Sequence, residues 1–186
     1  LAEDVRGLKV YVAVDISASM SGAIEKAKGY LTSFLQGFPL EKLVVAVFNS
    51  SAREVKIRHP SKRGVVHAFK GFRAGGGTNH GAAISDVFAY QPPAADEDAL
   101  FLFIGDQQQH GTFTRVVREN QMNPVAFGFL HVPGNGGRSN RAVEGTAEAL
   151  GIPCFSISED MFGDAYAVSR TLKNLIAATP VGARQA

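Results

Sequence analysis

Five side chains that end in oxygen atoms occur along the chain in an order that suits a metal ion. They are the carboxylates and hydroxyls of Asp15, Ser17, Ser19, Thr78 and Asp106. Carboxylate and hydroxyl oxygens, with no His or Cys required, are the ligands that hard cations such as Mg²⁺, Mn²⁺ or Ca²⁺ prefer. Hydroxyl ligands donate little charge, so the cation would stay electrophilic. The residue types therefore predict a divalent-cation site that can accept a further carboxylate from outside the protein.

Two expected strands and a glycine-rich turn would bring these side chains together. The apolar runs at residues 8–14 and 99–104 are typical of strands buried on both faces, and an aspartate closely follows each. Ligands of open parallel sheets bind beyond the carboxyl ends of the strands, where the strand order reverses. The turn at residues 74–77 holds three glycines, which permit close approach of the backbone, and leads into Thr78. All three segments are expected on one rim of the sheet.

Apolar runs alternate with segments of helical periodicity along nearly the whole chain. Further strands are expected at 43–48, 53–59, 124–131 and 153–157, and helices at 21–36, 61–70, 80–89, 112–121, 141–150 and 165–178. The pattern predicts an α/β fold of three layers, with a doubly wound, mostly parallel six-stranded sheet between helices. The alternating segment 53–59 is the expected antiparallel edge strand. We expect one domain over residues 1–180 and a flexible tail at 181–186.

The pattern Asp15-x-Ser17-x-Ser19, followed by Thr78 and Asp106, resembles the metal-ion-dependent adhesion site of von Willebrand factor A (VWA) domains. The expected order of strands and helices also fits that family over essentially the whole chain. The resemblance implies that Ser17 and Ser19 bind the metal directly, Thr78 directly or through water, and the two aspartates mainly through water. It implies a recognition module, not an enzyme, that binds an acidic side chain of a partner protein. Neither a membrane nor a small-molecule substrate is expected.

The run from Asp15 to Met20, with Gly76-Gly77-Thr78, is also similar to the C-terminal A domain of Ro autoantigen (TROVE) proteins. Those proteins join this domain to a helical-repeat ring that binds small noncoding RNAs. The similarity implies a cytoplasmic location and a noncoding-RNA ribonucleoprotein as an alternative partner. Two features depart from that pattern: Asn79 replaces an Asp, and residues 105–109 form an unusual loop. No ring-forming repeat is evident in the sequence.

Composition narrows the remaining classes of protein. The formal net charge is only +2, and Lys56, Arg58, Lys62 and Arg63 form no single stripe, so a solvated surface is favoured over a nucleic-acid site. The single cysteine, Cys154, excludes an internal disulfide and a cysteine metal cluster. No apolar stretch approaches the roughly 20 residues that cross a bilayer.

A metal-dependent phosphoryl-transfer enzyme is a further alternative, since aspartyl phosphotransferases carry their nucleophile where Asp15 stands. Those enzymes usually need a second Asp two residues later, and that position is Ser17 here. No Gly-Lys-Ser/Thr follows the glycine-rich turn, which excludes a nucleotide P-loop. His80 and His110 are expected on the same rim, either in contact with a ligand or as solvated loop residues.

Overall fold

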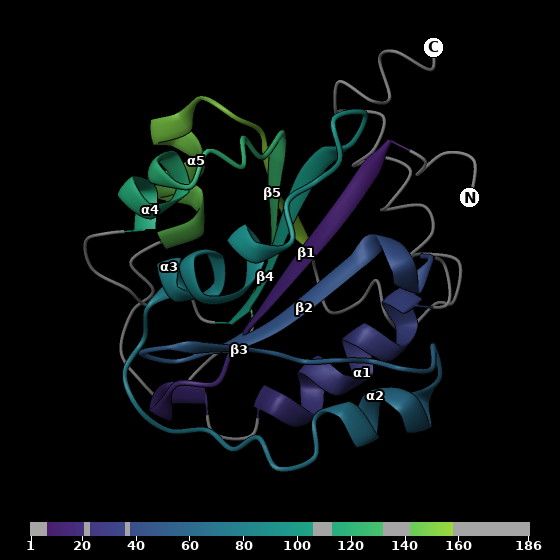
Figure 1. Ribbon diagram of the computed structural model, residues 1–186. Coiled ribbons are helices and arrows are strands. Elements are labelled where there is room, and N and C mark those ends of the chain that lie inside the picture. The colour runs from purple at the N-terminus through teal and green to yellow at the C-terminus, as the bar shows by residue number, and fades with distance from the viewer. Residues whose placement is uncertain (1–6, 21–22, 36–37, 106–112, 132–141, 158–186) are drawn as a thin grey trace.

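The computed structural model describes residues 7–20, 23–35, 38–105, 113–131 and 142–157, which form a six-stranded sheet between helices (Figure 1). The strands are β1 (Leu8–Asp15), β2 (Leu43–Phe48), β3 (Ala52–Glu54), β4 (Asp98–Gly105), β5 (Ala126–His131) and β6 (Cys154–Ile157). Their order is β3-β2-β1-β4-β5-β6, and every pair is parallel except the antiparallel β2–β3 pair. The predicted fold class is confirmed, including the antiparallel edge strand.

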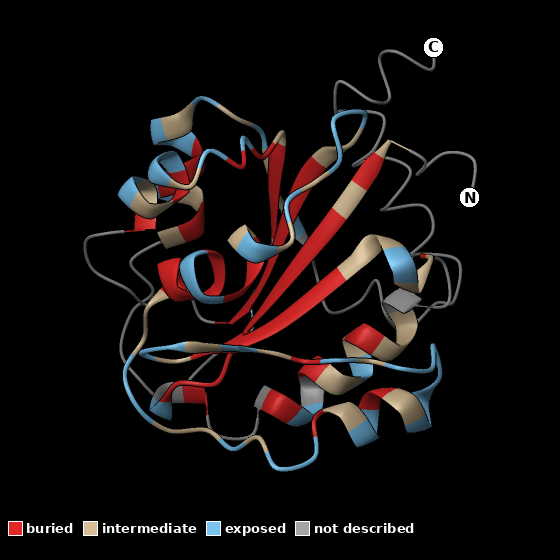
Figure 2. Cartoon of the chain, viewed as in Figure 1, coloured by how far each residue is buried: buried red, intermediate tan, exposed pale blue. Residues whose placement is uncertain are grey.

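Helices cover both faces of the sheet, which explains why the central strands are continuously apolar (Figures 1 and 2). The helices on one face are α1 (Ala23–Leu35) and α2 (Lys62–Ala68); those on the other are α3 (His80–Ala82), α4 (Phe113–Glu119) and α5 (Ala142–Leu150). Successive residues of β1 pack on opposite faces, with Val12 and Val14 in one core and Tyr11 and Ala13 in the other. The apolar side chains of β1 thus contribute alternately to two separate cores.

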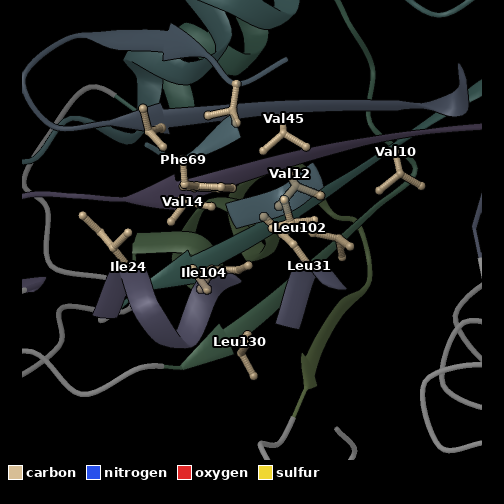
Figure 3. Packing of buried hydrophobic residues seen from close by; sticks show 14 of the residues in the cluster. Val10, Val12, Val14, Ile24, Leu31, Val45, Phe69, Leu102, Ile104 and Leu130 are labelled. Carbon is tan, nitrogen blue, oxygen red and sulfur yellow. The ribbon is translucent and has the colours of Figure 1, made fainter. Parts of the chain in front are cut away.

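The core beneath α1 and α2 is mainly aliphatic (Figure 3). Ile24 and Leu31 of α1 stand seven residues apart, about two helical turns, so both reach the strand valines from one face of the helix. Phe69, just after α2, is 1% exposed and fills the same core. The other core is rich in phenyl rings, for example Phe101 and Phe127, whose centroids lie 5.8 Å apart.

The expected helix at 80–89 is present but changes geometry along its length. A π-helical segment, η3 (Ala83–Val87), follows α3, and a 3₁₀ turn, η4 (Phe88–Tyr90), ends the run. Short 3₁₀ turns also occur at η1 (Ala18–Met20) and η2 (Leu40–Lys42).

The edge strand is shorter than its sequence pattern predicts. Only Ala52–Glu54 pair as a strand, although the Val55 N–H still donates to the Val45 carbonyl at 2.8 Å. Beyond that bond the chain turns toward α2. The expected helix at 165–178 and the expected tail at 181–186 lie outside the described residues. In the described part of the chain, no helix is long and apolar enough to span a membrane.

Candidate metal site

Asp15 and Ser17 lie at the carboxyl end of the central strand, where the strand order reverses. From β1 the chain moves outward to β2 and β3 and then returns to β4 on the other side, so the β1–β4 boundary is the switch point. Both residues are 1% exposed. Asp15 Oδ1 accepts a hydrogen bond from the Ser17 N–H at 2.8 Å, which orients the carboxylate. A carboxylate this deeply buried needs such hydrogen bonds, or a cation, to offset its lost hydration.

The chain after Ser17 turns instead of continuing the strand. Met20 N–H donates to the Ser17 carbonyl at 2.9 Å and closes the 3₁₀ turn η1. Ser19 lies within this turn, and its side chain is outside the described residues. The strand thus ends at Asp15, and burial continues through Ile16 and Ser17, so the alternation of side chains expected from Asp15 to Ser19 is not observed.

The glycine-rich turn pairs directly with the loop after β1, as predicted. Ala18 N–H donates to the Gly76 carbonyl at 3.0 Å, and Gly75 N–H donates to the Ile16 carbonyl at 2.8 Å. Gly76 has a φ of 79°, a conformation that L side chains rarely adopt. This turn leads through Gly77 to the half-buried Thr78. Two of the three predicted segments thus meet in the described structure.

The residues on either side of Thr78 are hydrogen-bonded to the end of β2. The Gly77 N–H donates to Ser50 Oγ at 3.2 Å, and the Asn79 N–H donates to the Asn49 carbonyl at 2.8 Å. Asn49 Nδ2 also donates to the Gly75 carbonyl at 3.0 Å. We call Asn49 and Ser50 the β2 clamp, because together they fix the backbone around Thr78.

The β2 clamp was not predicted from the sequence, although a signal was present. Asn49 and Ser50 directly follow the buried strand β2, and polar residues in that position point to the functional rim for the same reason as Asp15 does. Their role depends on the pairing of β2 with β1, which places Phe48 beside Asp15.

Gly105, the last residue of β4, touches Asp15. A Cβ atom at Gly105 would lie 2.7 Å from Asp15 Cβ and 3.3 Å from Asp15 Oδ2. Any other residue would collide with the Asp15 side chain, so glycine is required here for packing. The next residue, Asp106, was predicted to bind the metal and lies outside the described residues.

Of the two expectations for His80, that of a solvated loop residue is wrong. Its side chain is 1% exposed and packs among phenyl rings, with centroid distances of 4.8 Å to Phe48 and 5.5 Å to Phe113. His80 begins a helical run in which Ala83, Ile84 and Val87 are buried, and the spacing i, i+3, i+4, i+7 puts position 80 on the same face. His110 lies outside the described residues.

Asn79 provides one more oxygen beside Thr78. Its Oδ1 atom is buried and has no hydrogen-bond partner in the described part of the protein. A buried carbonyl oxygen normally accepts a hydrogen bond, from protein or from ordered water. By contrast, no three His, Cys, Asp or Glu side chains gather among the described residues.

Two ionisable groups with shifted pKa values, Glu97 and Tyr11, lie toward the opposite end of the strands. Burial opposes ionisation of Glu97, but hydrogen bonds from Lys42 and from the Ala94 N–H, with the charges of Lys42 and Lys9, outweigh it. The pKa of Glu97 therefore falls below its usual 4.5. Lys42 Nζ is 2.5 Å from Glu97 Oε2. Burial, with the charge of Glu97, raises the pKa of Tyr11, whose hydroxyl donates to the Gln91 carbonyl at 2.5 Å.

Solved structures with the same fold include several VWA-type domains. A von Willebrand factor type A protein from Catenulispora acidiphila has 16% sequence identity and a TM-score of 0.62, with 92% of this chain and 42% of that chain covered. The manganese-loaded TRAP protein of Plasmodium vivax has 17% identity and a TM-score of 0.58, covering 76% of this chain and 62% of that chain. An aerotolerance-related membrane protein from Bacteroides fragilis has 16% identity and a TM-score of 0.63, covering 90% of this chain and 100% of that chain.

These similarities show that the chain has the VWA-type fold, as the sequence predicted. No protein-family model and no curated protein sequence matches the chain. At 16–17% identity the structural likeness extends to the fold and not to the activity.

Proposed function

We propose that this protein is a divalent-cation-dependent recognition module that binds an acidic side chain of a partner protein. Asp15, Ser17, Ser19, Thr78 and Asp106 would hold the cation, with Mg²⁺ or Mn²⁺ as the first candidates and Ca²⁺ as a third. When bound, the ion would supply an electrophilic centre for an incoming carboxylate. The observation that carries the proposal is the burial of Asp15 and Ser17, each 1% exposed, at the switch point of the sheet.

The oxygen donors of the described residues suit this role. A buried carboxylate, a buried hydroxyl and the half-buried Thr78 on a backbone held by the β2 clamp are hard ligands without a strong charge excess. The TRAP protein of Plasmodium vivax, which shares the fold, was crystallised in a manganese-loaded form.

Isothermal titration with Mn²⁺ and with Mg²⁺ tests the cation site. Wild type should release or absorb heat on binding, and Asp15→Asn, which keeps the shape of the side chain and removes its charge, should lose most of that affinity. Asp86→Asn is the matched control, because Asp86 is an exposed carboxylate that accepts a hydrogen bond from the Ala52 N–H at 3.0 Å. Equal heats from wild type and Asp15→Asn would refute the site.

Water-proton relaxation of the Mn²⁺-loaded protein tests the open position. Added acetate should lower the relaxation enhancement as the carboxylate displaces metal-bound water, whereas chloride at equal ionic strength should not. An unchanged enhancement would show that the bound ion accepts no external carboxylate.

A further inference from the structure

The positive charge of this protein is concentrated in one segment of the chain. Residues 53–73 hold seven of the 19 Lys and Arg residues but one of the 17 Asp and Glu residues. This segment therefore carries a net charge of +6, and the rest of the chain carries −4. The two values add up to the overall +2. The low net charge thus does not mean that the charge is spread evenly.

All seven cationic side chains are exposed: Arg53, Lys56, Arg58, Lys62, Arg63, Lys70 and Arg73. Two exposed histidines, His59 and His67, lie among them. The segment comprises β3, the extended chain that follows it, and α2, at the lower edge of the molecule in Figure 2. We call these nine side chains the basic surface.

Helix α2 and the turn after it expose cations on a single face. Val65 and Phe69 point into the core, being 0% and 1% exposed. Arg63 and His67, four residues apart, occupy the opposite face, and the exposed Lys62, Val66 and Lys70 flank it. The amphipathic pattern of this segment therefore has a cationic outer side.

Strand β3 is held against the chain that follows α2, so both ends of the segment contribute to one surface. The Arg53 guanidinium lies 4.8 Å from the centroid of the Phe72 ring. Such cation–π contacts restrict the guanidinium while its charge remains available at the surface. Lys56 and Arg58 alternate with Val55 and Ile57, which pack on the core beneath α1 and α2, so the two cations point to the outer side of this edge.

Within the described residues, none of the seven cations forms a salt bridge. Cations gathered without acidic partners repel one another, which destabilises the folded state. A polyanionic ligand that neutralises several of these cations relieves their repulsion. It also releases its own bound counterions, and both effects favour binding.

We infer that the basic surface binds the phosphate backbone of a nucleic acid without sequence preference. A protein interface normally has an apolar or aromatic centre and few lysines. Among the described residues the exposed large hydrophobic side chains are Val66 and Tyr90, and only Val66 lies here. Stable attachment to a membrane normally combines such charges with an inserted apolar group or a lipid anchor. Binding of a polyanion requires no apolar contact, so the composition of the basic surface favours nucleic acid over a protein or a membrane.

Fluorescence anisotropy with a labelled 20-nucleotide single strand of mixed sequence tests this inference in EDTA, so that the cation site plays no part. Seven phosphate contacts predict a slope of log K against log salt of about −5, or roughly 10³-fold weaker binding at 200 mM than at 50 mM salt. Lys62→Gln/Lys70→Gln should reduce the slope to about −3.5, and hence the loss to roughly 10²-fold. Arg115→Gln/Arg118→Gln, with two exposed cations removed from α4, is the matched control and should behave as wild type.

Three results would overturn the inference. The first is no binding at 50 mM salt, and the second is an equal loss of affinity in both double variants. The third is equally tight, equally salt-dependent binding of polyglutamate or of phosphatidylserine vesicles, which would identify a general anion surface. Because EDTA is present throughout, a failure of the cation site leaves this test unaffected.

Discussion

Replacing Gly105 by alanine places a new carbon atom in the contact between the end of β4 and Asp15. The added Cβ would lie 2.7 Å from Asp15 Cβ, well inside the usual carbon–carbon contact of about 3.5–4.0 Å. A Cβ position is fixed by the backbone, so no change of rotamer relieves the overlap. The ends of two hydrogen-bonded parallel strands would have to separate.

We expect Gly105→Ala to lower the free energy of unfolding by about 1–3 kcal/mol, the usual cost of overpacking. For a chain of this size that corresponds to a fall in melting temperature of roughly 2–12 °C. The shift should displace the Asp15 carboxylate as well, so Mn²⁺ affinity should fall together with stability.

Gly29→Ala is the matched control, because nothing lies within 4 Å of its added Cβ in helix α1. Relief of the glycine penalty within a helix should raise stability by about 0.8–1.0 kcal/mol. Urea denaturation of both variants, with an unchanged m-value, gives the comparison. If Gly105→Ala is as stable as wild type, or is destabilised but binds Mn²⁺ normally, the packing argument for Asp15 is wrong.

Three further predictions concern the clamp, the buried histidine and the distal ion pair. Asn49→Ala removes the hydrogen bond donated to the Gly75 carbonyl and the one accepted from the exposed Ser51 N–H, and should cost about 1–2 kcal/mol of stability. Asn120→Ala removes the bond donated to the Val116 carbonyl and should cost about 1 kcal/mol. Only Asn49→Ala should weaken Mn²⁺ binding in titration calorimetry, by about fivefold; equal affinities in the two variants would show that the clamp does not position the site. His80→Ala should leave a cavity in the core and lower the free energy of unfolding, measured by urea denaturation, by about 2–4 kcal/mol, with unchanged Mn²⁺ affinity. A loss of Mn²⁺ affinity would show that His80 contributes to the metal site. Because the folded pKa of Glu97 lies below 4.5, ionised Glu97 stabilises the fold above that pH, and the advantage of wild type over Glu97→Gln should shrink as the pH falls through the folded pKa. A gap in melting temperature that stays constant from pH 7 to 3 would contradict this.

The layered fold could be predicted from the sequence because it depends on local periodicity. The run from Leu8 to Val14 is apolar at every position but Lys9, and such a run is stable only as a strand covered on both faces. Segments with helical spacing, such as the one that became α1, supply the covering layers. The placement of Asp15 at a strand end follows from the same pattern, since the aspartate appears where the apolar run stops.

Tertiary structure decided which distant residues meet at that rim. The pairing of β2 with β1 brings Asn49 to the glycine-rich turn, 26 residues further along the chain, and the pairing of β4 with β1 brings Gly105 onto Asp15. Neither contact leaves a local pattern, because each depends on strand order and register. The burial of His80 could not be predicted for the same reason, since it depends on which face of the helix meets the sheet.

The basic surface, too, is visible only in part from the sequence. The charges of residues 53–73 are visible in the sequence, yet they form no periodic stripe there, because they belong to a strand, an extended segment and a helix with different repeats. Only folding, with Arg53 set against Phe72, gathers them at one edge of the molecule. The sequence alone determined the chemistry of the oxygen ligands and the elements that carry them. The three-dimensional arrangement decided their neighbours, since contacts between distant segments are set by the packing of the whole sheet.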